Sequence, residues 1–224
     1  MSEGETMEVA ESAPAVTERL QALRPEEAYE VRHWWRRLTL PAEELKAFTQ
    51  APPWPKGVRA RLRRCESLEA AMLAEAFRTL WHRVEQVGKH SIEPRDSRLQ
   101  AWACIALILS ELRKDISDVP LGRQLGQQKS ETGKPCMSEL RFQQLMSCQS
   151  SEELIKRLRR ALRLVDSQDK PDKRGVSVVH LADNIALWWR ESRGELAPQP
   201  SSRLGFLWAN DYFEALSRYQ RASD

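Results

Sequence analysis

The sequence has few cysteines and no long apolar run. Its four cysteines are scattered, without a CxxC pair or the dense spacing of a disulfide framework, so we expect reduced thiols. The longest apolar run, 101–109, is about half as long as a membrane-spanning helix needs to be. The N-terminal segment is acidic and has no apolar core like that of a secretion signal. These absences predict a soluble, cytoplasmic protein that makes no membrane contact.

The common catalytic and metal-binding motifs are also missing. The histidines are far apart, with no HExxH pair and no Cys/His spacing for a metal. The glycine-containing loop 121–135 differs from a phosphate-binding P-loop, because Pro135 stands where that motif requires Ser or Thr. The paired carboxylates of Glu43 and Glu44 are typical of a helix N-terminus. We therefore expect no enzyme activity, no metal and no cofactor.

Apolar residues recur at helical spacing along the chain, whereas strand alternation is missing. This pattern predicts an all-α protein made of helical bundles, with two small helical lobes packed together. We expect an acidic, disordered tail at 1–25, lobes at 26–118 and 138–224, and a loop or boundary at 119–137, where glycines and prolines concentrate. The expected helices are 25–40, 43–48, 58–87 with a break near Ser67, 97–116, 121–125, 138–147, 150–165, 177–192 and one after 202.

Arginine supplies most of the basic charge. The chain has 26 arginines, nine lysines and a formal net charge of +3. Because residues 1–25 have five acids and two bases, residues 26–224 carry +6. Arginine binds phosphate through a planar pair of N–H donors, so the bias favours a polyanionic partner.

Two stretches concentrate these arginines. In 56–64, a lysine and four arginines precede the first acid, Glu66, and ion pairs from Arg63 to Glu66 or Glu69 are the structural alternative. In the helix expected at 150–165, apolar side chains share one face, and the opposite face is basic over about 10 Å, which suits one or two phosphates. Neither stretch has the Asn or Gln expected for reading base edges, so phosphate and sugar contacts are favoured. The basic face consists of Lys156, Arg159, Arg160 and Arg163.

Six short motifs occur together in a recognisable order. The sequence from about residue 30 to 190 resembles the CasB family, the small subunit of the type I-E CRISPR surveillance complex Cascade. The motifs that carry the resemblance are RLRRCES (61–67), AFRTLW (76–81), LGRQLG (121–126), SELRFQQL (138–145), RLRRALRLV (157–165) and LWWR (187–190).

The resemblance implies a non-catalytic helical subunit of an antiviral ribonucleoprotein. Its implied partners are the other Cascade subunits, including the backbone subunits and the large subunit, the guide RNA complex, and a second copy of itself. It also implies contact with the target and displaced DNA strands, which would stabilise the R-loop through their backbones. The residues expected to contact nucleic acid are Arg63, Arg64, Arg98, Arg123, Arg141, Arg157, Arg159, Arg160 and Arg163.

Two other functions fit parts of the pattern. A helix-turn-helix transcriptional regulator would use 139–147 and 152–165 as its helix pair, joined by a short turn. Its second helix lacks residues for base reading, and the arginines extend beyond the pair. A scaffold that contacts proteins through its tryptophans is the third alternative.

Overall fold

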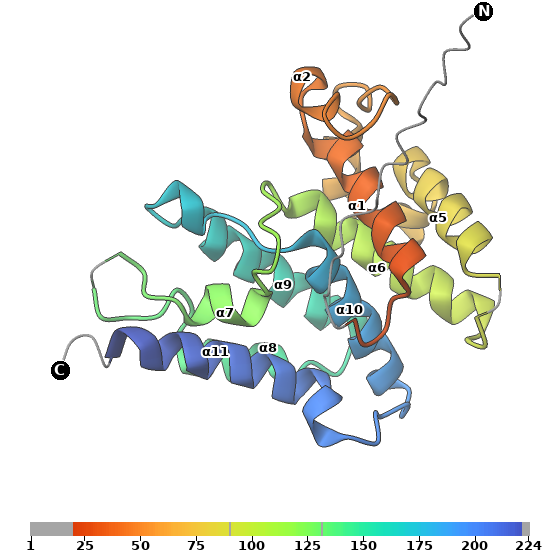
Figure 1. Cartoon of the computed structure of the whole chain (residues 1–224). Helices are drawn as coiled ribbons and strands as arrows, with labels where there is room; N and C mark the ends of the chain where they lie inside the picture. The colour runs from red at the N-terminus through yellow and green to blue at the C-terminus, as the bar shows by residue number, and fades with distance from the viewer. Residues whose placement is uncertain (1–19, 90, 131, 221–224) are drawn as a thin grey trace, which may run out of the picture.

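The structure is a computed structural model that describes residues 20–89, 91–130 and 132–220. Within them the chain forms eleven α-helices, two single 3-10 turns and no strand, which confirms the all-α prediction (Figure 1). The helices are α1 (Pro25–Thr39), α2 (Ala42–Leu45), α3 (Val58–Arg63), α4 (Leu68–Met72), α5 (Glu75–Val87), α6 (Arg95–Glu111), α7 (Leu121–Gly126), α8 (Glu139–Met146), α9 (Ser151–Asp166), α10 (Val178–Ser192) and α11 (Leu204–Gln220). The 3-10 turns are Pro171–Lys173 and Pro200–Ser202.

Helix α6 lies at the centre of the fold. Every residue from Ala101 to Glu111 is buried, because α1, α3, α4, α5, α9 and α10 all pack around it. A helix that is apolar on all sides is stable only in such surroundings. The helix ends at Glu111 and not near residue 116 as expected, because Leu112 is already extended and Asp115 forms a bridge with Val176.

One hydrophobic core contains side chains from both sides of the predicted boundary at 119–137. Trp35 of α1 and Ile105 of α6 belong to it, as do Leu158 of α9 and Trp188 of α10. The Trp35 indole N–H donates to the carbonyl of Leu109, 3.1 Å away. This core fixes α9 against α6, and the division into two lobes stays a prediction.

The segment 58–87 is broken twice, whereas the sequence predicts a single break. The first piece, α3, ends at Arg63, and Ser67 caps α4, since its hydroxyl accepts the Ala70 N–H at 3.1 Å. Ala74 is extended and separates α4 from α5. The resulting short helices α3 and α4 both pack on α6. Arg159 of α9 donates to the carbonyl of Arg63, the last residue of α3.

Two glycines let α7 lie directly on α11. A Cβ on Gly126 would come within 2.2 Å of the Tyr212 carbonyl oxygen, and one on Gly122 within 2.8 Å of the Trp208 carbonyl oxygen. Both contacts are too short for any side chain, so the helix pair depends on glycine at these positions. The ring of Tyr212 also stacks on Phe142 of α8, with the ring centroids 4.1 Å apart.

The N-terminal end of the described chain is anchored by a buried carboxylate. One Oδ of Asp183 accepts the backbone N–H groups of Ala22 and Leu23, both at 2.8 Å. Most of the predicted acidic tail, residues 1–19, lies outside the described residues. In the part of the chain that the structure covers, no helix is long and apolar enough to cross a membrane.

Candidate nucleic-acid interface

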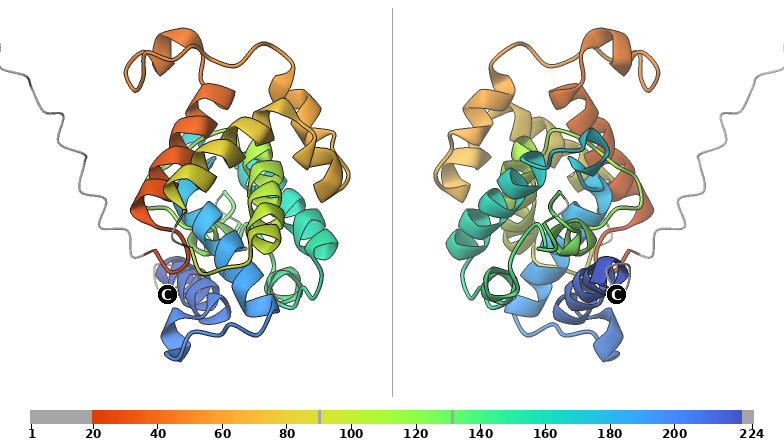
Figure 2. Two further views of the ribbon diagram at one scale, coloured as in Figure 1. Left: turned by 90° about the vertical axis from the view of Figure 1, so that its right-hand side faces the viewer. Right: turned by 90° about the vertical axis from the view of Figure 1, so that its left-hand side faces the viewer.

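Helix α9 has one apolar face and one basic face. Ser150 caps the helix, and its hydroxyl accepts the Glu153 N–H at 3.2 Å. Leu154, Leu158 and Leu162 are buried against the core. The basic face is therefore turned outward, and Figure 2 shows α9 on the flank of the molecule between α4 and α8.

A groove of about 590 Å³ runs between α8 and α9, and we call it the α8–α9 groove. Apolar side chains, among them Leu145 and Leu164, form part of its lining. Its acidic side chain, Glu153, is already paired with Arg157, with 3.1 Å between carboxylate and guanidinium. The groove is thus strongly cationic, and its basic residues are Arg141, Lys156, Arg157, Arg160 and Arg163.

Four of these cations are exposed and available to a ligand. Arg141, Lys156, Arg160 and Arg163 make no hydrogen bond or ion pair within the described residues. Arg157 differs, because it binds Glu153 and also donates to the Gln144 carbonyl. Within the described chain no ion pair neutralises the positive charge that these four cations give the groove.

Helices α3 and α9 meet at a buried carboxylate. The Nε of Arg63 lies 2.9 Å from one oxygen of Glu111, and the Nε of Arg159 lies 3.2 Å from the other. Arg159 also donates to the carbonyls of Arg63 and Cys65, at 3.0 and 3.1 Å. The expected ion pairs from Arg63 to Glu66 or Glu69 are therefore wrong, because Glu111 is buried beside Arg63.

Arg59 also stabilises the fold, at the end of α6. Its guanidinium donates to the carbonyls of Ser110 and Leu112, each at 2.8 Å, at the C-terminal end of α6. These carbonyls have no partner within their own helix, and a cation is favourable beside them. Two of the five cations in the basic stretch 56–64, Arg59 and Arg63, thus stabilise the end of α6 and are not free for a phosphate.

Arg98, one of the predicted contacts, lies in the interior of the protein. Its side chain is 8% exposed and pairs with Glu27 at 2.8 Å. It also donates to the carbonyls of Val84 and Gly88 at the end of α5. Glu27 and the two carbonyls hold this charge inside the protein, so the Arg98 side chain is not available to a phosphate at the surface.

Two other predicted arginines lie away from the α8–α9 groove. Arg64 is exposed at the end of α3 and does not line the groove. Arg123 is on α7, where its charge opposes the burial that raises the pKa of Asp211 on α11. Of the nine predicted contacts, the groove brings together Arg141, Arg157, Arg160 and Arg163.

The predicted set leaves out two residues of the groove whose side chains can donate a hydrogen bond to a phosphate. Lys156 belongs to the basic face that helical spacing already identifies on α9. Gln144 is on α8 and lines the groove only because α8 and α9 are adjacent, which the sequence does not show.

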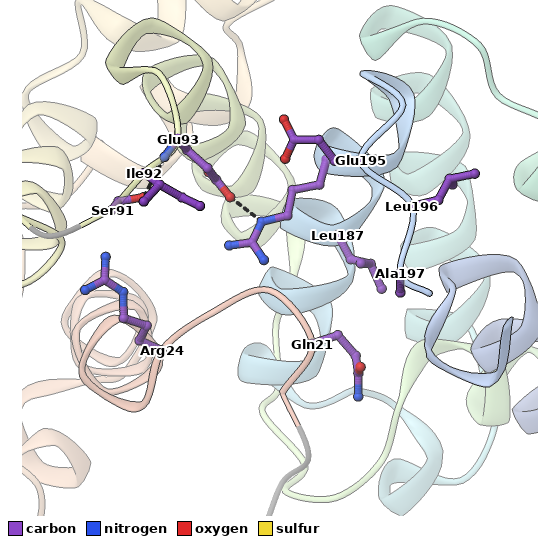
Figure 3. A pocket seen from close by; sticks show the side chains of 10 residues that line it. Gln21, Arg24, Ser91, Ile92, Glu93, Leu187, Glu195, Leu196 and Ala197 are labelled. Atoms are coloured by element: carbon purple, nitrogen blue, oxygen red, sulfur yellow. Dashed lines mark hydrogen bonds and ion pairs between the residues drawn. The ribbon is translucent and has the colours of Figure 1, made fainter. Parts of the chain in front are cut away.

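A second cavity, of about 570 Å³, lies beside α10 and is drawn in Figure 3. It contains two arginines, yet both are engaged. Arg190 pairs with Glu93 and donates to the Ala22 carbonyl at 2.8 Å, and Arg24 donates to the Gly88 carbonyl. This cavity therefore offers less unpaired positive charge than the α8–α9 groove.

Comparison with known families identifies the chain. The model of the family described as CRISPR-associated protein Cse2 matches residues 58–213, which contain α3 to α10 and the whole α8–α9 groove. The chain belongs to the Cse2 (CasB) family. This confirms the resemblance found in the sequence. No curated protein and no solved structure matches the chain.

Membership of the Cse2 family implies the role of a small Cascade subunit in CRISPR defence. Proteins of this family are structural subunits and are generally non-catalytic. Within the described residues, no group of three or more His, Cys, Asp and Glu side chains could hold a metal ion. The family assignment also argues against the helix-turn-helix regulator.

Proposed function

We propose that the α8–α9 groove binds the phosphate backbone of nucleic acid and that the chain stabilises the R-loop of Cascade in this way. The observation that carries the proposal is the set of four exposed, unpaired cations on facing helices, Arg141 on α8 and Lys156, Arg160 and Arg163 on α9. Backbone contacts suit a complex in which guide pairing supplies the choice of sequence.

The lining of the groove favours binding that is independent of sequence. Lys156 and Arg163 are separated by seven residues of helix, about 10 Å, which is enough for one or two phosphates. The apolar residues of the groove, Met137, Leu145 and Leu164, include no aromatic ring on which a base could stack. The contacts are therefore electrostatic, and they depend on salt.

We infer the partners from the family. In the assembled particle the chain contacts the backbone subunits, the large subunit and a second copy of itself, and it lies against the target and displaced DNA strands. Membership of the Cse2 family supports association with Cascade, and the groove supports the contact with DNA.

The test is the salt dependence of DNA binding by the full chain. Each phosphate contact contributes roughly 0.7 to 0.9 to the slope of log K against log salt, so Arg160→Ala/Arg163→Ala should flatten the slope by roughly 1.4 to 1.8. Fluorescence anisotropy with unrelated single- and double-stranded oligonucleotides measures this slope. Because both side chains are exposed, the melting temperature should not change.

The matched control is Arg78→Ala, an exposed arginine on α5, which lies apart from α9 (Figure 1). Equal slopes for Arg78→Ala and the double variant would contradict the proposal. In the assembled complex the double variant should retain guide RNA and lose target DNA more readily. Loss of guide RNA instead would indicate a role in assembly.

A further inference from the structure

A second hollow lies on the other side of α9. It has a volume of about 370 Å³ and is bounded by α9 and by the start of α4, so we call it the α4–α9 hollow. Figure 2 shows α4 and α8 on opposite sides of α9. Three cations line both depressions and form the ridge between them: Lys156, Arg160 and Arg163.

The two sides of this ridge differ in charge. The α8–α9 groove has a single acid, Glu153, and Arg157 neutralises it. The α4–α9 hollow has three acids, Glu66, Glu69 and Glu152. Its one additional cation, Arg159, is held by Glu111 and by two backbone carbonyls.

No ion pair neutralises the three acids of the hollow within the part of the chain that the structure describes. Within the described residues, Glu66 and Glu69 make no ion pair, and both side chains are exposed. Hydrogen bonds from its own backbone N–H and from the Ser150 hydroxyl lower the pKa of Glu152, so this carboxylate is ionised at neutral pH. A phosphate entering the hollow would meet two acids, Glu66 and Glu69, on the wall opposite the ridge, and a third, Glu152, on α9 itself.

Helical spacing on α9 fixes this asymmetry. Residues three and four apart share a side of a helix, which places Glu153, Arg157 and Arg160 toward α8. The same rule places Glu152, Arg159 and Arg163 toward α4. The Arg160 side chain can reach either depression, and the charges on the two walls decide which one a strand occupies.

We propose that Glu66, Glu69 and Glu152 form an acidic border that confines the bound strand to the α8 side of α9. The inference rests on the proposed function and adds to it the side of α9 on which the strand lies, because the border makes the α4 side of the ridge repulsive to phosphate. Such repulsion acts within a Debye length, about 8 Å at physiological salt, which is comparable to the width of a helix.

The experiment neutralises the border in the full chain. Glu66→Gln/Glu69→Gln should let phosphates enter the α4–α9 hollow, so single-stranded DNA should bind several-fold more tightly. The slope of log K against log salt should become steeper by roughly 0.7 to 0.9 for one added contact. The control Glu43→Gln/Glu44→Gln changes the net charge equally at exposed positions of α2 and should leave the slope unchanged.

Cross-linking from Cys65 reports the position of the strand. Cys65 adjoins Glu66 and is partly exposed, whereas the other three cysteines are buried. Burial raises the pKa of Cys104 to about 12 and those of Cys136 and Cys148 to about 11, so a maleimide photo-crosslinker should attach mainly to Cys65. It should capture little DNA in the parent protein and several-fold more in Glu66→Gln/Glu69→Gln.

The outcomes separate the two proposals. If Arg160→Ala/Arg163→Ala does not alter the slope, the proposed function fails. If that variant flattens the slope while Glu66→Gln/Glu69→Gln matches the α2 control in slope and cross-linking, the groove is correct and the border is wrong. Strong cross-linking from Cys65 in the parent protein would also overturn the border, because the strand would then already lie on the α4 side.

Discussion

The tetrapeptide Arg-Leu-Arg-Arg occurs twice, at 61–64 in α3 and at 157–160 in α9, and the two copies can be compared position by position. The leucines, Leu62 and Leu158, are both fully buried. The arginines that follow them, Arg63 and Arg159, both bind Glu111. The same local sequence therefore produces the same arrangement in two helices that approach α6 from different places.

The copies differ at their outer arginines. Arg64 directly follows the six-residue helix α3 and lines neither depression beside α9, whereas Arg160 lies on the ridge between the two. Arg61 is exposed, whereas Arg157 is held by Glu153 and the Gln144 carbonyl. The comparison shows that the tetrapeptide fixes the buried leucine and the arginine that binds Glu111. The neighbouring helices decide whether the two outer arginines are held or face a groove.

The largest effect is expected at the two buried leucines. Leu62→Ala and Leu158→Ala each leave a cavity in the core and should destabilise the protein by about 2 to 5 kcal/mol. Urea denaturation followed by circular dichroism measures both losses. A loss below about 1 kcal/mol for either variant would mean that its copy does not anchor its helix to the core.

A smaller effect on stability is expected at the shared carboxylate. Glu111→Gln removes the charge that Arg63 and Arg159 both bind, and hydrogen bonds to charged groups contribute about 1.5 to 3 kcal/mol. We expect a loss of about 2 kcal/mol in urea denaturation, because Glu111 is buried and Arg63 is partly exposed. Glu85→Gln, which breaks the exposed pair with Arg95, should leave the denaturation midpoint unchanged.

An unchanged urea denaturation midpoint for Glu111→Gln would show that the contact between α3 and α9 depends on packing alone. DNA binding should stay intact in this variant, since Glu111 lines neither the α8–α9 groove nor the α4–α9 hollow.

Helical spacing was sufficient to predict most of the fold. The apolar stripes identify the helices, and the predicted break near Ser67 falls between α3 and α4, since these features act over a few residues. The end of α6 could not be predicted in this way. It depends on Arg59 and on the bridge between Asp115 and Val176, which join segments far apart in the sequence.

The site was predictable only in part, for the same reason. The angular position of Arg160 and Arg163 on their own helix follows from the sequence. The partner of Arg98 does not, because Glu27 lies 71 residues away. A charge count treats Arg98 and Arg160 alike, and only the folded chain shows which one is already neutralised.

The smallest change in structure, and the sharpest test of the comparison, is the removal of the last arginine of each copy. Arg64→Ala and Arg160→Ala remove the same group from exposed positions, so both should leave stability within about 0.5 kcal/mol of the parent protein. Only Arg160→Ala should flatten the salt dependence of DNA binding, by roughly 0.7 to 0.9, because a phosphate held in the α8–α9 groove touches Arg160 and not Arg64. Anisotropy titrations at several salt concentrations, with Arg78→Ala as the reference, measure all three slopes. If Arg64→Ala flattens the slope as much as Arg160→Ala, the strand continues past α9 onto the end of α3, and the groove alone does not define the interface.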